Sequence, residues 1–324
     1  MSSENILITG ITGQDGIFLT SLLLKDSKKY NIIGLSRKND KTFFKKINSI
    51  NADVDTTKIS LLNLDLKDKY EVSRLIKETS PAQIYNLTGP SSVYESIRKP
   101  KLYSYLIPVI FNNIVESCIE HNIFPSFFQA SSSEMFSVEN KIPLNEKSQY
   151  EPRSPYSMAK YQVFKSVNNL KQKYDWNIKN GIMFNHESEF RDEEYLFSKI
   201  IDAAIAIKNK KQSVLKVGSL TYVRDWSFAG DIAEAVASVN SYDDISDFVI
   251  GSGTGTSIQK LVEITFSELG LDYEDFIEVD SNLLRVGDPE IVISDPSKLK
   301  SKLGWYPKVN VEKLIQRCIN FRTN

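Results

Sequence analysis

The residue types best suited to proton transfer lie in one short part of this 324-residue chain. Three consecutive serines end at Ser133 and are followed by Glu134, and Tyr156 and Lys160 come after a polar loop. Hydroxyl, carboxyl and phenol groups can hold or move a proton at a bound substrate. Because Tyr156 and Lys160 are four residues apart, a helix would place them on one face. Neither signal is specific alone, since serine clusters also form turns and this Tyr–Lys spacing is common by chance.

Alternating apolar strands and helices would position these residues. The serines follow the predicted strand Phe127–Ala130, and Pro155 opens a predicted helix that runs to Tyr174. Four further strands are predicted at Asn31–Leu35, Ile59–Leu66, Ile84–Leu87 and Trp176–Phe184. The alternation predicts an α/β protein with a doubly wound parallel (Rossmann) sheet, whose ligands bind at the carboxyl ends of the strands. We expect a dinucleotide-binding domain over 1–183 and a smaller, mixed substrate-binding domain over 184–324, with segments such as 224–245 able to return to the first.

The segment Asn5–Leu24 reads as a strand, a tight loop and a helix. Its loop contains Gly10, Gly13 and Gly16 in the spacing G-x-x-G-x-x-G, where glycine permits the turn, the approach of a diphosphate and close helix packing. The helix N-terminus would favour the diphosphate charge. A plain glycine turn would look similar. The predicted cofactor contacts of this loop are Gly10, Thr12, Gly13, Gln14, Asp15 and Gly16.

The end of the second strand indicates which dinucleotide binds. Folds that prefer NAD usually have an acid there, whereas this chain has Arg37 and Lys38. Two cations would accommodate a 2′-phosphate, which predicts NADP, although a solvated basic turn has the same composition. Asp65, at the third strand end, could bond the adenine amino group or cap the next helix. Leu66 and Leu87 complete the predicted cofactor contacts.

The overall composition argues against several other classes of protein. Apolar residues make up 41% of the chain, charged residues 25%, and the net charge is −1, so no general field favours nucleic acid or an anionic membrane. The two cysteines, Cys118 and Cys318, suit a reduced compartment. With only two histidines we expect no metal site. Without a signal peptide or an apolar run long enough to span a bilayer, we expect a cytoplasmic protein.

Taken together, the motifs resemble the extended short-chain dehydrogenase/reductase family, and within it the GDP-mannose 4,6-dehydratase subgroup. The matching stretches are ITGITGQDG (8–16), IYNL (84–87), FQASSSE (128–134), EPRSPYSMAK (151–160), NGIMFNHES (180–188), SKI (198–200) and RDW (224–226). The resemblance spans nearly the whole chain. It implies bound NADP, a nucleotide-sugar substrate, most simply GDP-linked, and no net use of cofactor.

The resemblance also implies roles for the acid–base residues. Tyr156 takes the proton of the sugar 4-hydroxyl, with its pKa lowered by Lys160 and the nicotinamide cation. Ser132, where the family usually has threonine, bonds the 4-oxygen. Glu134 takes the C5 proton and Ser133 helps the C6 hydroxyl to leave. The implied substrate-binding residues are Ser91, Asn185, His186, Glu187, Lys199, Arg224, Arg285 and Asp288.

The chain departs from the family after its fourth strand, where Gly89, Pro90, Ser91 and Ser92 replace the usual glutamine and histidine. The sugar, the base and the final product therefore stay open, and a GDP-linked heptose or an N-acetylated hexose remains an alternative. A related 4-keto reductase or epimerase, and a non-catalytic NADP-binding protein, are the competing interpretations. The family implies a homodimer through Leu102–Ile119 and Pro155–Tyr174, with a tetramer left open.

Overall fold

The computed structural model describes residues 3–26, 29–37, 41–284 and 287–323. At its centre is a seven-stranded, entirely parallel sheet with the strand order β11-β6-β5-β4-β1-β2-β3. The strands are β1 (Glu4–Thr9), β2 (Tyr30–Ser36), β3 (Ile59–Asn63), β4 (Gln83–Asn86), β5 (Ser126–Ser132), β6 (Ile178–Met183) and β11 (Phe248–Ile250). The order reverses between β1 and β4, which is the position where doubly wound sheets bind their ligands. The predicted Rossmann fold is confirmed.

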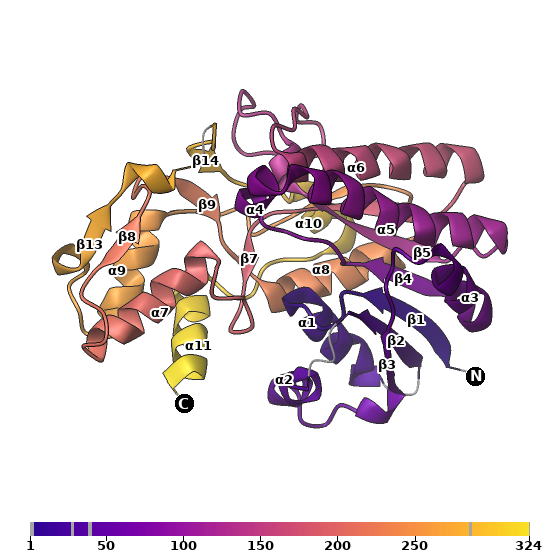
Figure 1. Cartoon of the computed structure of the whole chain (residues 1–324), viewed down its shortest axis with the longest axis horizontal. Coiled ribbons are helices and arrows are strands. Elements are labelled where there is room, and N and C mark those ends of the chain that lie inside the picture. Colours follow the sequence, from indigo (N-terminus) through magenta and orange to yellow (C-terminus); the bar gives the residue numbers. More distant parts are fainter. Residues whose placement is uncertain (1–2, 27–28, 38–40, 285–286, 324) are drawn as a thin grey trace.

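Helices cover both faces of this sheet (Figure 1). One face carries α1 (Gln14–Leu23), α2 (Phe43–Ile50) and α8 (Ala229–Ser241), and the other carries α3 (Lys69–Thr79), α5 (Pro100–Glu120) and α6 (Pro155–Tyr174). Six of the seven strands are largely buried, because a parallel sheet between two helical layers has no solvent-facing side, whereas the edge strand β3 is mostly exposed. This packing leaves only the strand ends available for chemistry.

Helix α6 has the bounds expected from the sequence, and its start is defined locally. The Ser154 and Ser157 side chains form a reciprocal capping box, and Pro155 occupies the first turn, where its missing N–H costs nothing. Tyr156 and Lys160 therefore lie in the first two turns of a helix whose N-terminus is fixed by a capping box. They face inward, since both side chains are buried.

The C-terminal half contains α7 (Leu196–Lys208), α9 (Ile258–Glu268), α10 (Ser297–Leu303) and α11 (Val311–Thr323) with three small sheets. These sheets pair β7 (His186–Glu187) with β10 (Ser227–Phe228), β8 (Leu215–Val217) with β13 (Ile277–Val279), and β9 (Val223–Asp225) with β12 (Gly255–Ser257) and β14 (Ile291–Val292). The chain also returns to the large sheet, through α8 and β11. The returning segment thus reaches Ile250, beyond the range 224–245 inferred from the sequence.

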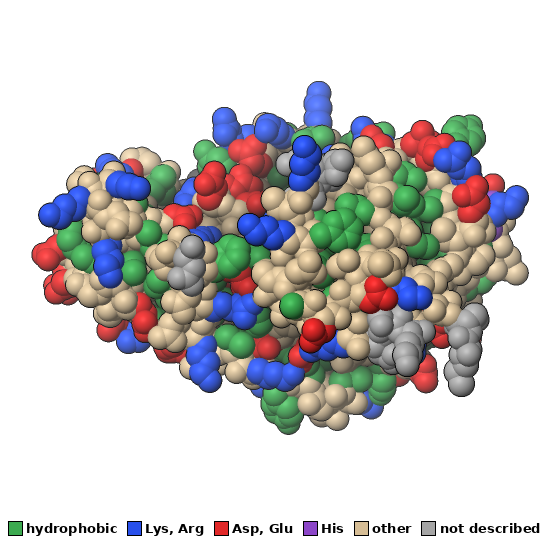
Figure 2. Space-filling model, turned by 90° about the horizontal axis from the view of Figure 1, so that it is seen from below, with side chains coloured by type: hydrophobic (Ala, Val, Ile, Leu, Met, Phe, Trp, Pro, Cys, Tyr) green, Lys and Arg blue, Asp and Glu red, His purple; other side chains and the backbone are tan. Residues whose placement is uncertain are grey.

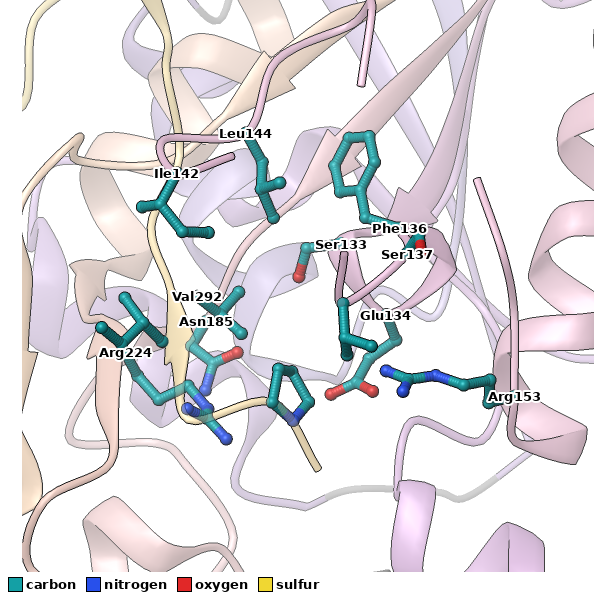
Figure 3. Close-up of a pocket in the computed structure, with 13 residues that line it drawn as sticks. Ser133, Glu134, Phe136, Ser137, Ile142, Leu144, Arg153, Asn185, Arg224 and Val292 are labelled. Carbon is teal, nitrogen blue, oxygen red and sulfur yellow. The ribbon is translucent and has the colours of Figure 1, made fainter. Parts of the chain in front are cut away.

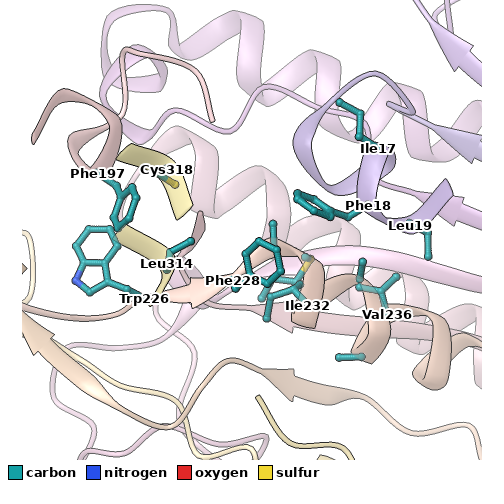
Figure 4. Packing of buried hydrophobic residues seen from close by; sticks show 14 of the residues in the cluster. Ile17, Phe18, Leu19, Phe197, Trp226, Phe228, Ile232, Val236, Leu314 and Cys318 are labelled. Atoms are coloured by element: carbon teal, nitrogen blue, oxygen red, sulfur yellow. The ribbon is translucent and has the colours of Figure 1, made fainter. Parts of the chain in front are cut away.

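One apolar cluster joins the two halves (Figure 4). Phe18 of α1 lies edge-on against Phe228 at 5.1 Å between ring centroids, and Phe197 contacts Trp226 at 5.9 Å. Figure 4 shows Leu314 and Cys318 of α11 beside this second pair. The glycine-loop helix α1 is therefore packed directly on elements of the C-terminal half, which fixes the two halves relative to each other.

Two acidic residues of the C-terminal half anchor neighbouring segments of the chain. Asp231 does not cap α8, whose N-cap is Phe228; its carboxylate accepts bonds from the backbone of Lys308 at 2.7 Å and Val309 at 2.9 Å. Residues 224 and 225 lie in strand β9. Asp225 in that strand accepts hydrogen bonds from Ser252 and Ser294, so it anchors the neighbouring loops.

Helix α5 is long and apolar enough to cross a bilayer by length and composition, contrary to our expectation that no segment would be. Of its apolar window, 61% is buried inside the protein, against α3, α6 and the sheet. It is a core helix of the molecule, and such helices often meet the same criteria.

The charges of the surface are mixed in sign. On the face shown in Figure 2, Lys and Arg side chains are interspersed with Asp and Glu side chains. This distribution matches the net charge of −1, and no broad area of one sign dominates that face.

Candidate active site

The structure brings the predicted hydroxyl and phenol groups together where β5 ends and α6 begins. Ser132 is the last residue of β5, and its Oγ accepts a hydrogen bond from the backbone N–H of Glu134 at 3.3 Å. The Ser132 hydroxyl also bonds the Tyr156 side chain. Lys160 donates from Nζ to the carbonyl oxygen of Ala130 at 2.8 Å. All of these side chains except Glu134 are nearly inaccessible to solvent.

The electrostatics of Tyr156 differ from expectation. Burial raises its pKa above the ordinary value, the Ser132 hydrogen bond lowers it, and Glu134 raises it further. Lys160 is directed to a backbone carbonyl, with its Nζ 5.8 Å from the Tyr156 ring centroid. Burial also lowers the pKa of Lys160 to about 8, although Asp15 opposes this change. Within the chain itself, desolvation therefore outweighs the activation of Tyr156 that we expected.

Glu134 lies in a small pocket between the two halves of the chain (Figure 3). Ser133, to which the resemblance assigns a catalytic role, lines the same pocket as Asn185 and Arg224, to which it assigns substrate binding. Figure 3 shows the Glu134 carboxylate and the Arg153 guanidinium pointing toward each other. A carboxylate of this kind can accept a proton in a partly desolvated place.

The glycine loop has the geometry that a diphosphate site requires. Gly10 has φ +72°, and a Cβ there would lie 3.2 Å from the Leu87 backbone. At Gly16, a Cβ would lie 2.5 Å from Ile11, so only glycine lets α1 approach the strand. Thr88 Oγ1 is buried beside Gly10 and has no hydrogen-bond partner among the described residues. This cradle and the unsatisfied hydroxyl fit a bound dinucleotide.

The other predicted cofactor contacts are placed as follows. Thr12 Oγ1 lies 3.0 Å from Ser36 Oγ. Arg37 is exposed at the end of β2. Burial raises the pKa of the Asp65 carboxyl, but the hydrogen bonds from Lys67 lower it more, and the charge of Arg37 lowers it further. Leu66 is buried, and its carbonyl accepts from Asn113 at 2.8 Å. Lys38 lies outside the described residues.

Two residues of the glycine loop contact the segment that was expected to bind substrate. His186 Nε2 is 3.0 Å from Asp15 Oδ1, and Gln14 Nε2 donates to the His186 carbonyl at 3.0 Å. Burial raises the pKa of Asp15 and lowers that of His186, but their mutual attraction outweighs burial, so the Asp15 pKa is lowered and the His186 pKa raised. His186 therefore lies at the junction of the glycine loop and the C-terminal half. Its pairing with Asp15 favours the imidazolium form.

We expect this ion pair to make stability depend on pH. Because the folded pKa of His186 is raised, its contribution is complete below the unfolded pKa of about 6.5 and is lost as the pH rises through the folded value. Because the folded pKa of Asp15 is lowered, its contribution is lost as the pH falls below the unfolded pKa of about 3.9. The melting temperature of the wild-type protein should thus fall between pH 6 and 8 more steeply than that of His186→Gln. His121→Gln, at the other histidine, is the control; equal slopes for all three proteins would contradict the pairing.

The remaining predicted substrate residues are distributed unevenly. Glu187 is buried and pairs with Arg191, whose Nε is 3.1 Å from its Oε2, so it faces an internal partner. Arg224 reaches Asp288 at 3.1 Å, and both are largely buried. Lys199 is exposed on α7. Ser91 is bonded to Tyr195, and Arg285 lies outside the described residues.

Sequence reasoning missed four residues at this site, namely Thr88, Arg153, Arg191 and Tyr195. The i,i+4 spacing of Glu187 and Arg191 could have indicated the ion pair. The others required the fold, because a threonine after a strand or a tyrosine before a helix has no distinctive pattern.

The comparisons with known proteins agree with this geometry. Residues 7–318 match the family model described as GDP-mannose 4,6 dehydratase. A curated relative, GDP-mannose 4,6 dehydratase 2 of Arabidopsis thaliana, is 34% identical over 321 residues and covers 97% of this chain and 85% of its own.

Two solved structures show the same fold. UDP-glucose-4-epimerase from Stenotrophomonas maltophila with bound NAD has a TM-score of 0.87 at 17% identity, covering 99% of this chain and 98% of its own. RMD from Pseudomonas aeruginosa complexed with NADPH has a TM-score of 0.80 at 19% identity, covering 98% and 97%. With the family model matched over nearly the whole length, this chain belongs to the GDP-mannose 4,6-dehydratase family.

Proposed function

We propose that this nucleotide-sugar 4,6-dehydratase converts GDP-mannose, or a close relative of it, to the GDP-4-keto-6-deoxy sugar and uses NADP. The observation that carries the proposal is the placement of Glu134 in one pocket with Ser133 and Arg224, directly after the Ser132–Tyr156 pair. From the chain itself, oxidation at C4 needs only a base and a hydroxyl partner, because a bound nicotinamide would accept the hydride. A carboxylate positioned beside them supplies the second proton transfer that elimination of water requires.

The chain's own groups divide the work between the two proton transfers. Tyr156 removes the proton from the 4-hydroxyl, and Ser132 holds the 4-oxygen from the other side. When bound at the glycine loop, a nicotinamide would supply the hydride acceptor and donor that the chain itself lacks. The resulting 4-keto group acidifies C5–H, so Glu134 removes that proton and passes it to the departing C6 hydroxyl, which is bonded to Ser133 and leaves as water. A proton from solvent then replaces the lost one at C5 as C6 is reduced. Reduction at C6 balances oxidation at C4, and the net change is the loss of one water molecule.

A turnover assay with a substrate panel tests this proposal. The purified protein, supplied with catalytic NADP, is given GDP-mannose, another GDP-hexose and UDP-hexoses separately, and products are identified by mass spectrometry and NMR. We expect loss of 18 mass units and a new C6 methyl signal with a GDP-hexose. A product that keeps its C6 oxygen would point to the epimerase or reductase. Cofactor binding without turnover of any sugar would point to a binding protein.

The cofactor preference depends on Arg37 in this proposal. Either dinucleotide fits the fold, since one neighbour was solved with NAD and another with NADPH. Arg37 is exposed at the end of β2, with no acid at the strand end itself, and can pair with a 2′-phosphate. Arg37→Ala should therefore weaken NADP binding about 10- to 100-fold, the size of a charge-assisted contact, and leave NAD binding nearly unchanged. Lys45→Ala, an exposed lysine on α2, is the control in the calorimetric titration. Equal losses for both cofactors would contradict this role.

We further infer a homodimer formed by α5 and α6. These helices pack side by side, and they leave large apolar side chains exposed: Leu102 by 46%, Tyr105 by 58% and Met158 by 54%. Two copies related by a twofold axis would cover this surface in a four-helix arrangement. Light scattering should give twice the 36.9 kDa mass of one chain, and Tyr105→Glu should shift the mass toward that of the monomer.

A further inference from the structure

A hydrogen bond between Ser91 and Tyr195 joins the two halves of the chain near the reacting groups. The two hydroxyl oxygens are 2.7 Å apart. Ser91 belongs to the loop after β4, whereas Tyr195 is the N-cap residue of α7. The bond therefore links a loop of the dinucleotide-binding sheet to the first helix of the C-terminal half, 104 residues further along the chain.

The Tyr195 ring is held in place from one side. The Arg191 guanidinium lies over it, with 3.5 Å between the guanidinium carbon and the ring centroid. Arg191 is in turn fixed by Glu187, which is buried. Because its ring is stacked on a guanidinium that is itself anchored, Tyr195 presents its hydroxyl in a defined direction.

The Tyr195 side chain is within electrostatic reach of Tyr156. Burial is the largest cause that raises the pKa of both Tyr156 and Tyr103, and Tyr195 raises both further. Tyr103 also packs edge-on against Tyr156, with 6.4 Å between ring centroids. Ser91 follows β4 at the carboxyl edge of the large sheet, next to the point between β1 and β4 where doubly wound sheets bind their ligands. The Ser91–Tyr195 pair therefore lies at the edge of the sheet where a sugar would be bound.

This hydrogen bond would contribute little to the stability of the fold. It is exposed, and a hydrogen bond that competes with water adds only about 0.5–1.5 kcal/mol. As a recognition element it is well suited, because each hydroxyl can both donate and accept. A hydroxyl group of a ligand can therefore replace either partner without leaving the other unsatisfied.

We propose that Ser91 and Tyr195 together bind a hydroxyl group of the hexose and position the sugar over Tyr156. This inference rests on the proposed function, in that the ligand is a nucleotide sugar. It adds Tyr195 as a substrate-binding residue and gives Ser91 a specific partner. The pair acts on the sugar, so the nucleotide alone should not sense it.

The test is a double-mutant cycle on the full-length protein. Tyr195→Phe keeps the ring and its stacking on Arg191 but removes the hydroxyl, and Ser91→Ala removes the other. Each should raise KM for the nucleotide sugar about 5- to 10-fold, the effect of one lost hydrogen bond, and leave kcat within about twofold. The double variant should be little worse than either single variant, because both remove the same pair. Affinity for the nucleoside diphosphate alone, measured by calorimetry, should stay unchanged.

Tyr273→Phe is the matched control. The Tyr273 hydroxyl accepts a comparable exposed hydrogen bond from Gln259 at 2.9 Å, and both residues are remote in sequence from Ser91 and Tyr195. Three results would overturn the inference while the wild-type protein still turns over its substrate. These are an unchanged KM in both single variants, effects on KM that multiply in the double variant, or an equal loss of affinity for the nucleotide alone. If the wild-type protein turns over no nucleotide sugar, the proposed function fails, and this inference fails with it.

Discussion

Replacement of Tyr156 by phenylalanine is expected to lower kcat about 10²- to 10⁴-fold, the usual contribution of a positioned acid–base group. The Tyr156 hydroxyl bonds Ser132 and is the only part of the side chain that the substitution removes. The ring would still pack against Tyr103, so the melting temperature should change by only a few degrees. Affinity for the dinucleotide, measured by calorimetry, should change less than kcat.

Tyr161→Phe provides the control for this measurement. Tyr161 lies one and a half turns further along α6, stacked on Phe164 and close to Tyr150, where its hydroxyl has no place in the proposed chemistry. We expect nearly wild-type turnover. If Tyr156→Phe kept more than a tenth of the wild-type kcat, another group would have to remove the first proton.

The fold and the acid–base residues were predictable because both depend on local patterns. Apolar runs separated by glycine and serine define the strands of the sheet and α6, and parallel strands necessarily bring their carboxyl ends together. Thus Ser132, Tyr156 and the glycine loop meet, although they are far apart in sequence. The same reasoning locates Glu134 two residues after the buried end of β5.

The partners of His186 and Glu187 could not be predicted in this way. Whether a charged residue faces the substrate or an internal counter-ion depends on how the two halves pack, and here α1 is pressed against the C-terminal half by Phe18 and Phe228. That packing places Asp15 beside His186 and encloses Glu187 with Arg191. Similarly, the pKa of Tyr156 depends on how deeply α6 is buried, which a Tyr–Lys spacing does not encode.

Replacement of Glu134 by glutamine should stop the reaction at a later point than Tyr156→Phe does. The amide keeps the shape of the side chain but cannot accept the C5 proton, so formation of the 6-deoxy product should fall about 10²- to 10⁴-fold. The first proton transfer depends on Tyr156 and Ser132, which are unchanged. Addition of the nucleotide sugar should therefore still produce the near-ultraviolet absorbance of a reduced nicotinamide, now without water loss.

The isotope content of the product gives a second, independent measurement. In deuterated water, the wild-type protein should place deuterium at C5 of the product, because the proton removed there is replaced from solvent. Glu134→Gln should show neither this exchange nor product, whereas Glu139→Gln, which alters an exposed acid five residues further along, should resemble the wild type.

The two variants together distinguish the roles of the two groups. Tyr156→Phe should abolish the absorbance change and the exchange, since both require the 4-keto group, while Glu134→Gln should abolish only the exchange. If Glu134→Gln also abolished the absorbance change, the carboxylate would be needed for the first proton transfer or for binding. If it kept normal C5 exchange, the base would have to be another residue of the pocket. A reductase or epimerase would need no acid at this place, so the outcome at Glu134 decides whether the pocket is built for elimination.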